Sequence, residues 1–115
     1  LVLGVSLNPE RYSNMAIHRL CAHGLEVNAF GLRAGEICGV NIDTELQPYN
    51  AIHTVTLYLN PKRQQAYYEY IIDLKPARII FNPGTENPSF YKRLEEAGIE
   101  VLEACTLVLL RTGQY

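Results

Sequence analysis

The sequence predicts an α/β domain with three layers, in which a mostly parallel five- to six-stranded sheet lies between two layers of helices. Short apolar runs alternate with amphipathic stretches along the chain. These stretches are long enough for the helical crossovers of about a dozen residues that join parallel strands. Such crossovers are right-handed, and they cover both faces of the sheet. With 115 residues, the chain has room for one domain, spanning residues 1–115.

The strands are predicted from short apolar runs that contain β-branched or aromatic residues. They are expected at residues 1–5, 26–30, 40–42, 54–59, 78–81 and 99–102. The segment 31–39 carries three glycines, and we expect it to be a loop. Residues 40–42 follow that loop and are expected to form a short peripheral strand.

The helices are predicted from apolar residues at helical spacing between capping residues and helix breakers. They are expected at residues 13–24, 60–75, 87–98 and 106–111. Ser13 is the expected N-cap of the first helix, and asparagine followed by proline begins the second and third. The inward-facing residues are expected to be Ala16, Ile17, Leu20, Cys21, Tyr67, Tyr70, Ile71, Leu74, Phe90, Leu94 and Ala97.

Composition excludes several classes of protein. An apolar content of 48% is enough to fill a core without metal or disulfide support. Ten basic and twelve acidic residues give a net charge of −2 without a basic run, so we expect no nucleic-acid partner. No apolar stretch reaches the roughly 18 residues of a membrane span. Cys21, Cys38 and Cys105 form no CxxC pair, so we expect reduced thiols, no metal site and a cytoplasmic location.

The loop after the first strand is the first candidate site, because ligands of such sheets bind beyond the carboxyl ends of the strands. Of the dinucleotide motif G-x-G-x-x-G only Gly4 is present, since Ser6 and Pro9 occupy the other glycine positions. The loop therefore fails as an NAD motif. It is still suited to phosphate, and an ordinary capped turn is the alternative. The side chains that can donate hydrogen bonds or add positive charge are Ser6, Arg11, Ser13 and Asn14.

The loop after the second strand bears on which nucleotide would bind. An NAD-binding domain places an acidic residue there to accept from the ribose hydroxyl. This chain has no acid before Glu36 and carries Arg33 instead. A guanidinium suits a ribose that carries a phosphate, as in CoA or NADP. A solvated surface arginine is the alternative interpretation.

A set of motifs, taken together, resembles the small stand-alone CoA-binding domain proteins. These proteins are similar to the nucleotide-binding domain of the succinyl-CoA synthetase alpha subunit. The resemblance covers essentially the whole chain and implies a Rossmann-like domain that binds CoA, acyl-CoA or a related nucleotide. The motifs are Gly4-Val5-Ser6 with Pro9, the loop 31–39, Leu57-Tyr58-Leu59-Asn60-Pro61, Phe81-Asn82-Pro83-Gly84-Thr85-Glu86, Ala97-Gly98-Ile99 and Cys105.

The resemblance also implies binding residues but no catalytic ones. The implied ligand contacts are Gly4, Ser6, Asn8, Pro9, Arg11, Tyr12, Ser13, Asn14, Arg33, Asn60, Pro61, Pro83, Gly84 and Thr85. The chain departs from the family at 29–31, where Ala-Phe-Gly replaces the usual Val-Asn-Pro. The second half of the ligase active site is absent, so no ligase chemistry is implied.

No catalytic constellation is evident in the sequence, which favours a nucleotide-binding module over an enzyme. Cys105 precedes a short helix and is either a buried apolar residue or a thiol activated by the helix. The three histidines fall away from the expected ligand edge. An NAD(P)-linked oxidoreductase and a regulatory module without ligand are the alternatives. An exposed aromatic ring expected among Tyr67, Tyr68 and Tyr70 is a candidate surface for a homodimer.

Overall fold

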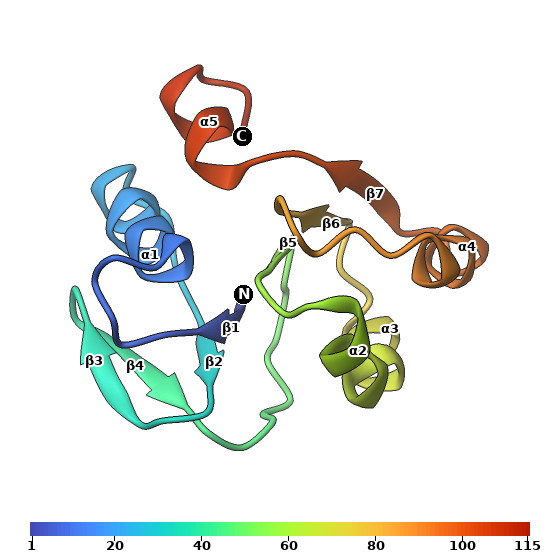
Figure 1. The fold of residues 1–115 in the computed structure, drawn as a ribbon, viewed down its shortest axis with the longest axis horizontal. Helices are drawn as coiled ribbons and strands as arrows, with labels where there is room; N and C mark the ends of the chain where they lie inside the picture. The colour runs from blue at the N-terminus through green and yellow to red at the C-terminus, as the bar shows by residue number, and fades with distance from the viewer.

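The computed structural model describes residues 1–115 and contains a seven-stranded sheet with helices on both faces (Figure 1). The strand order is β3-β4-β2-β1-β5-β6-β7, and every neighbouring pair is parallel except β3 with β4. This confirms the predicted three-layer, mostly parallel Rossmann-like architecture. The strands are β1 (Val2–Val5), β2 (Ala29–Gly31), β3 (Gly35–Ile37), β4 (Val40–Asp43), β5 (Thr54–Leu57), β6 (Arg78–Phe81) and β7 (Glu100–Glu103).

The sheet has one strand more than the five to six expected. The additional strand, β3, lies in the segment 31–39 that was expected to be a loop, and it pairs antiparallel with β4. Only Ile37 of its three residues is buried. One buried side chain gives no alternation that a sequence pattern could reveal. The strand is formed because a two-residue turn folds it back onto β4.

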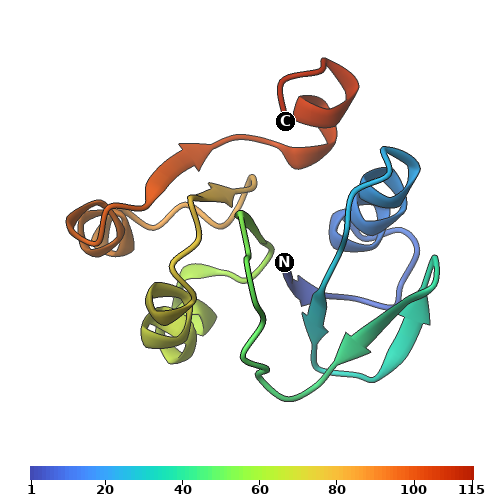
Figure 2. The ribbon, with the colours of Figure 1, turned by 180° about the vertical axis from the view of Figure 1, so that it is seen from behind.

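The helices form two layers, which the views from both sides show (Figures 1 and 2). One layer contains α1 and α5, which pack against each other. The other contains α2, the 3₁₀ helix η1, α3 and α4. The bounds are α1 (Tyr12–Ala22), α2 (Pro61–Gln64), η1 (Gln65–Tyr67), α3 (Tyr68–Leu74), α4 (Pro88–Glu96) and α5 (Thr106–Arg111).

Each face of the sheet has its own hydrophobic core. On β1, Val2 packs with Ile17 and Leu110 beneath α1 and α5. Its neighbour Leu3 points to the opposite face and packs in a cluster that includes Phe90 of α4. Successive residues of a strand point to opposite faces, so a strand covered on both sides is apolar throughout. This double burial explains why the strands appear as continuous apolar runs in the sequence.

The helix ends show where capping was predicted well and where it was not. Asn60 caps α2 as expected, because its Oδ1 accepts from the amide of Arg63 at 2.9 Å. Ser13 was wrongly expected to cap α1. The N-cap is Arg11, and Ser13 lies inside the helix, where its Oγ accepts from the amide of Ser6 at 3.1 Å. Ala97 was expected to face inward but is exposed, because it lies at the C-cap beyond the last helical turn.

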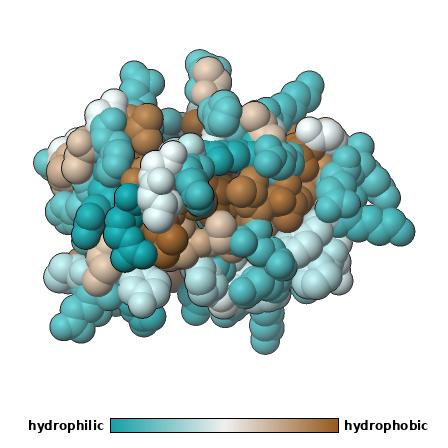
Figure 3. Space-filling model, turned by 90° about the horizontal axis from the view of Figure 1, so that it is seen from above, coloured by the Kyte–Doolittle hydropathy of each residue, from teal (hydrophilic) through white to brown (hydrophobic).

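The three tyrosines at the start of the α3 layer are all half-buried. Tyr67, Tyr68 and Tyr70 pack against the core on the α3 and α4 face. The expectation of one exposed ring among these tyrosines was therefore wrong, since all three are partly covered by the core on this face. Other apolar surface is exposed, however. Figure 3 shows a hydrophobic area bordered by hydrophilic side chains on one face of the molecule. Val108 of α5 is one of the exposed large hydrophobic residues.

None of the helices has the length and apolar character needed to cross a membrane.

Candidate functional site

A cleft of about 990 Å³ opens at the carboxyl ends of β1, β2, β5 and β6. The chain leaves β1 toward β2 on one side, and β5 lies on the other side of β1. The cleft thus lies at the topological switch point, where open α/β sheets bind their ligands. We call it the strand-end cleft. It is lined by residues 4–7, 10–13, 30–33, 58–60, 62, 63, 66, 67 and 83–85.

The floor of the strand-end cleft is formed where β1 passes close to the end of β5. Gly4 has a φ of +99°, a conformation that side chains other than glycine rarely adopt. A Cβ at this position would lie 3.0 Å from the Leu59 side chain and 3.1 Å from the carbonyl carbon of Tyr58. The main chain of β1 can approach β5 this closely only because residue 4 has no side chain.

The loop from β1 to α1 is held by hydrogen bonds among its own residues. Nδ2 of Asn14 donates to the carbonyl oxygen of Ser6 at 3.1 Å, and the amide of Ser6 donates to Oγ of Ser13. The amide of Asn8 donates to Oγ of Ser6, and the amide of Glu10 donates to Oδ1 of Asn8. These polar side chains therefore shape the loop, and the loop is ordered without a bound ligand.

Several main-chain amides of this loop have no acceptor within the protein. The amides of Leu7, Tyr12 and Ser13 donate to no protein atom. Tyr12 and Ser13 are the first two residues of α1, a helix of 11 residues whose amino end carries partial positive charge. Both line the strand-end cleft. Free amides at a helix amino end are a suitable site for phosphate oxygens.

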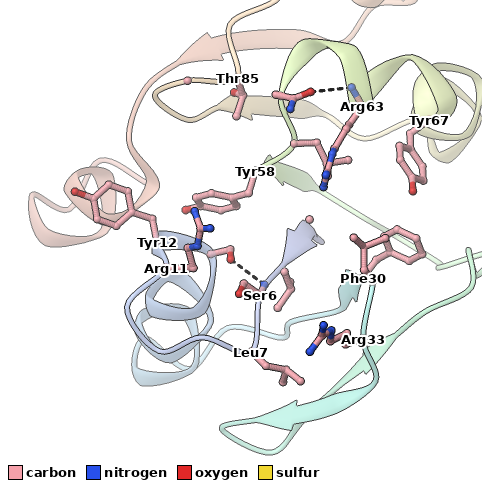
Figure 4. A pocket seen from close by; sticks show the side chains of 18 of the residues that line it. Ser6, Leu7, Arg11, Tyr12, Phe30, Arg33, Tyr58, Arg63, Tyr67 and Thr85 are labelled. Carbon is pink, nitrogen blue, oxygen red and sulfur yellow. Dashed lines mark hydrogen bonds between the residues drawn. The ribbon is translucent and has the colours of Figure 1, made fainter.

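Four cationic side chains surround the strand-end cleft, against one acid, Glu10. Arg11 precedes α1, Arg33 follows β2, and Lys62 and Arg63 belong to the short helix α2. Figure 4 shows Arg33 and Arg63 on opposite sides of the cleft. The one ion pair of the protein lies elsewhere, so none of these cations is neutralised. A chain with a net charge of −2 thus concentrates positive charge at this cleft.

The remaining wall of the strand-end cleft is fixed by a buried polar network. Gln64 is fully buried, and its Nε2 donates to the carbonyl oxygens of Leu59 at 2.8 Å and Thr85 at 2.7 Å. Its Oε1 accepts from Nδ2 of Asn87. This single side chain ties the start of α2 to the loop between β6 and α4. Thr85 Oγ1 donates to the carbonyl oxygen of Asn82, so it is not free for a ligand.

Aromatic and aliphatic side chains complete the lining. Phe30 and Tyr67 meet edge to face with ring centroids 5.5 Å apart, and both line the cleft. Leu7, Tyr12 and Leu32 lie at its rim and are among the six large hydrophobic residues of the protein that are exposed. A lining that carries both cationic and apolar side chains suits a ligand with both charged and apolar parts.

Tyr58 is an ionisable group of the lining whose pKa is shifted. Burial raises its pKa to about 12, and the nearby hydroxyls of Thr56 and Thr106 act in the opposite direction. Its hydroxyl is buried without a hydrogen-bond partner. The ring points away from the centre of the strand-end cleft, toward the side of Arg11 and Tyr12 (Figure 4). Tyr58 therefore stays protonated at neutral pH and offers no base to the site.

The structure brings together most, but not all, of the residues singled out in the sequence. Ten of the fourteen line the strand-end cleft: Gly4, Ser6, Arg11, Tyr12, Ser13, Arg33, Asn60, Pro83, Gly84 and Thr85. Four lie outside its lining: Asn8, Pro9, Asn14 and Pro61. Asn8 and Asn14 instead make hydrogen bonds that shape the first loop, and Pro61 is the first residue of α2. The amide of Gly84 donates to the Glu86 carboxylate at 2.8 Å.

Several lining residues were missed in the sequence, above all Lys62 and Arg63. Their signal was available, because they directly follow the predicted helix start at Asn60-Pro61 and so belong to a strand-end loop. Phe30 and Tyr67 carried no such signal. They lie far apart in the sequence, where Phe30 is expected in a strand and Tyr67 in the core, and their contact is formed only when β2 and η1 pack together.

No catalytic arrangement accompanies the strand-end cleft. Cys105 is the half-buried N-cap of α5 and does not line the cleft, nor does any of the three histidines. No group of three or more His, Cys, Asp or Glu side chains is placed to hold a metal ion.

The sequence model of the CoA binding domain family matches residues 1–111. The chain belongs to this family. Among solved structures, an uncharacterized protein shares 44% identity at a TM-score of 0.96, over 99% of this chain and 94% of its own. A protein from Pyrococcus horikoshii shares 26% identity at a TM-score of 0.81, over 96% of this chain and 80% of its own.

A more distant structural relative supports the fold alone. A protein from Thermus thermophilus shares 23% identity at a TM-score of 0.85, over 99% of this chain and 87% of its own. No curated protein matches the chain.

Proposed function

We propose that this CoA-binding-domain protein binds CoA or an acyl-CoA in the strand-end cleft. The observation that carries the proposal is the set of four unpaired cations, Arg11, Arg33, Lys62 and Arg63, around the free amides at the start of α1. In this arrangement the pyrophosphate lies against the amides of Tyr12 and Ser13. Two hydrogen-bond donors per guanidinium make arginine a strong partner for phosphate.

The placement of the cations fits a ligand with phosphate in two places. Arg33 lies at the end of β2, on the side of the cleft opposite Arg63 of α2. CoA carries a pyrophosphate and a separate phosphate on its ribose. NAD carries the pyrophosphate alone. The segment after β2 has no carboxylate to accept from a free ribose hydroxyl, because Leu32 and Arg33 follow Gly31 directly.

The apolar lining fits the remaining parts of the ligand. Phe30 and Tyr67 offer an aromatic wall for an adenine ring next to Arg33. Thr85 Oγ1 already donates to a protein carbonyl, whereas Ser6 Oγ only accepts from the amide of Asn8 and keeps its O–H free to donate. Main-chain amides, cations and the Ser6 hydroxyl therefore provide the polar contacts of the proposed complex.

Calorimetric titration with CoA, 3′-dephospho-CoA, NADP and NAD, in one buffer, tests the proposal. We expect CoA to bind about tenfold more tightly than dephospho-CoA, because a charge-assisted contact contributes about 1.5 kcal/mol. Tighter binding of NAD than of CoA would contradict the argument from Arg33. Tighter binding of NADP than of CoA would favour the oxidoreductase alternative, for which Arg33 is equally suited. Failure of all four ligands to bind would favour a regulatory or interaction module.

A further inference from the structure

Two cysteines that are distant in the sequence meet on the surface of the protein. Cys21 lies in the last turn of α1, and Cys38 lies in the turn between β3 and β4. The Sγ of Cys21 donates to the carbonyl oxygen of Cys38 at 3.9 Å, across 17 positions of the sequence. Because that oxygen is two bonds from the Cα of Cys38, the Cys21 thiol lies beside the main chain that carries the second thiol.

Cys38 also occupies a backbone conformation that is unfavourable for cysteine. Its φ is +52°, and the next residue, Gly39, has a φ of +79°. These two residues form the whole turn, because Ile37 pairs directly with Val40. Two-residue hairpin turns with positive φ at both positions favour asparagine, aspartate or glycine at the first position. A cysteine there strains the turn and places a thiol at its apex, next to α1.

We propose that Cys21 and Cys38 are a redox-active pair that forms a reversible disulfide between α1 and the β3–β4 turn. The structure shows the reduced form, in which all three cysteines are free thiols. The proposal concerns the thiol pair alone, so it holds whatever ligand the strand-end cleft takes.

The exposure of the two thiols sets the order of the reaction. Cys38 is exposed, whereas Cys21 is half-buried. Burial raises the pKa of the Cys21 thiol, and the neighbouring Cys38 raises it further. The thiolate is the nucleophile in disulfide exchange, so Cys38 is the thiol that meets an oxidant first. Cys21 then acts as the resolving thiol.

With a small disulfide such as oxidised glutathione as the oxidant, the exchange proceeds in two steps. The Cys38 thiolate attacks one sulfur of the oxidant, which forms a mixed disulfide and releases one glutathione. The Cys21 thiolate then attacks Sγ of Cys38, which forms the Cys21–Cys38 bond and releases the second glutathione. The two protein thiols lose two electrons and two protons, and the two released glutathione thiols carry them.

The disulfide would close a loop that contains β2 and β3, and with them Phe30 and Arg33. A cross-link that closes a loop of this length restricts the unfolded chain and stabilises the folded one. For a domain of this size we expect the midpoint of thermal unfolding to rise by roughly 5–10 °C on oxidation. Addition of dithiothreitol should reverse the rise.

The test is to oxidise the protein with oxidised glutathione or diamide and to map its disulfides by mass spectrometry under non-reducing conditions. We expect a peptide pair joined through Cys21 and Cys38, a mass lower by about two hydrogens per chain, and the rise in unfolding midpoint. Cys105→Ser should behave like the unchanged protein. Cys21→Ser should lose both the linked peptides and the rise.

Cys38→Asn provides a matched control that separates the thiol from the strain of the turn. Asparagine tolerates the positive φ, so this variant should be at least as stable as the reduced protein and should show no response to the oxidant. The proposal is overturned if the two thiols are modified singly, if Cys38 cross-links two chains, or if Cys38→Asn still responds to oxidation.

Discussion

Replacing Gln64 with leucine tests whether one buried side chain fixes the wall of the strand-end cleft. Gln64 is fully buried and makes hydrogen bonds of 2.8 Å and 2.7 Å to the carbonyl oxygens of Leu59 and Thr85. It also accepts from Asn87 at 2.9 Å. Leucine has a similar volume, so the change removes the hydrogen bonds and leaves little cavity. Three lost bonds at about 1 kcal/mol each, with the buried Thr85 carbonyl and the partly buried Leu59 carbonyl left unpaired, lower the free energy of unfolding by about 3–5 kcal/mol.

Urea unfolding followed by circular dichroism measures this loss as a lower midpoint at unchanged slope. The neighbouring Gln65 is exposed and makes no side-chain hydrogen bond, so Gln65→Leu is the matched control. We expect that control to change the free energy of unfolding by less than about 0.5 kcal/mol. A loss below about 1 kcal/mol for Gln64→Leu, or an equal loss for both variants, would refute the reasoning.

Three further predictions concern residues of the same cleft. Gly4→Ala should lower the free energy of unfolding by about 2 kcal/mol or more in the urea assay, because φ is +99° and the methyl group would meet Leu59. Gly98 also has a positive φ, but open space surrounds the position of its Cβ. Gly98→Ala should therefore lower the free energy of unfolding by less than Gly4→Ala does. Arg33→Ala should weaken CoA binding about tenfold in calorimetry and leave dephospho-CoA binding unchanged; an equal loss for both ligands would contradict a role at the ribose phosphate. Tyr58→Phe should cost no stability at neutral pH, because the buried hydroxyl has no partner.

The pH dependence of Tyr58 follows from the same burial. Its pKa is raised from 10 to about 12 in the folded protein. Because the unfolded chain releases this proton first, stability is complete below about pH 10 and falls as the pH rises toward 12, by at most about 1.4 kcal/mol per pH unit. Tyr58→Phe should remove the contribution of this hydroxyl to the fall in the free energy of unfolding between pH 10 and 12. Equal slopes for the two proteins in urea unfolding at pH 10–11 would show that another group is responsible.

The sequence and the structure agree best where local chemistry decides the outcome. Asparagine followed by proline marked the start of α2 because the asparagine side chain caps the next turn whatever packs around it. Lys75 ends α3 with a φ of +50° directly before the proline. The apolar runs marked β1, β5 and β6 because these strands are buried on both faces.

They disagree where a distant contact overrides the local signal. Ser13 has the chemistry of an N-cap, yet its hydroxyl accepts from Ser6 across the loop, and the N-cap is Arg11, two residues earlier. Strand β3 has a weak pattern of its own and is formed by pairing with β4. Gln64 is an ordinary polar residue in the sequence, and its burial arises only when α2 meets the loop that contains Thr85.

The sequence by itself determined the α/β architecture, the edge of the sheet where a ligand would bind, and the candidate role of Arg33. These depend on periodicity, capping and the alternation of strands and helices along the chain, which are local or nearly so. Only the tertiary structure decided which cations face the same cleft and which polar side chains are already engaged by the protein. It also brought Cys21 next to Cys38. Such contacts join segments that are far apart in the chain, so no property of either segment alone specifies them.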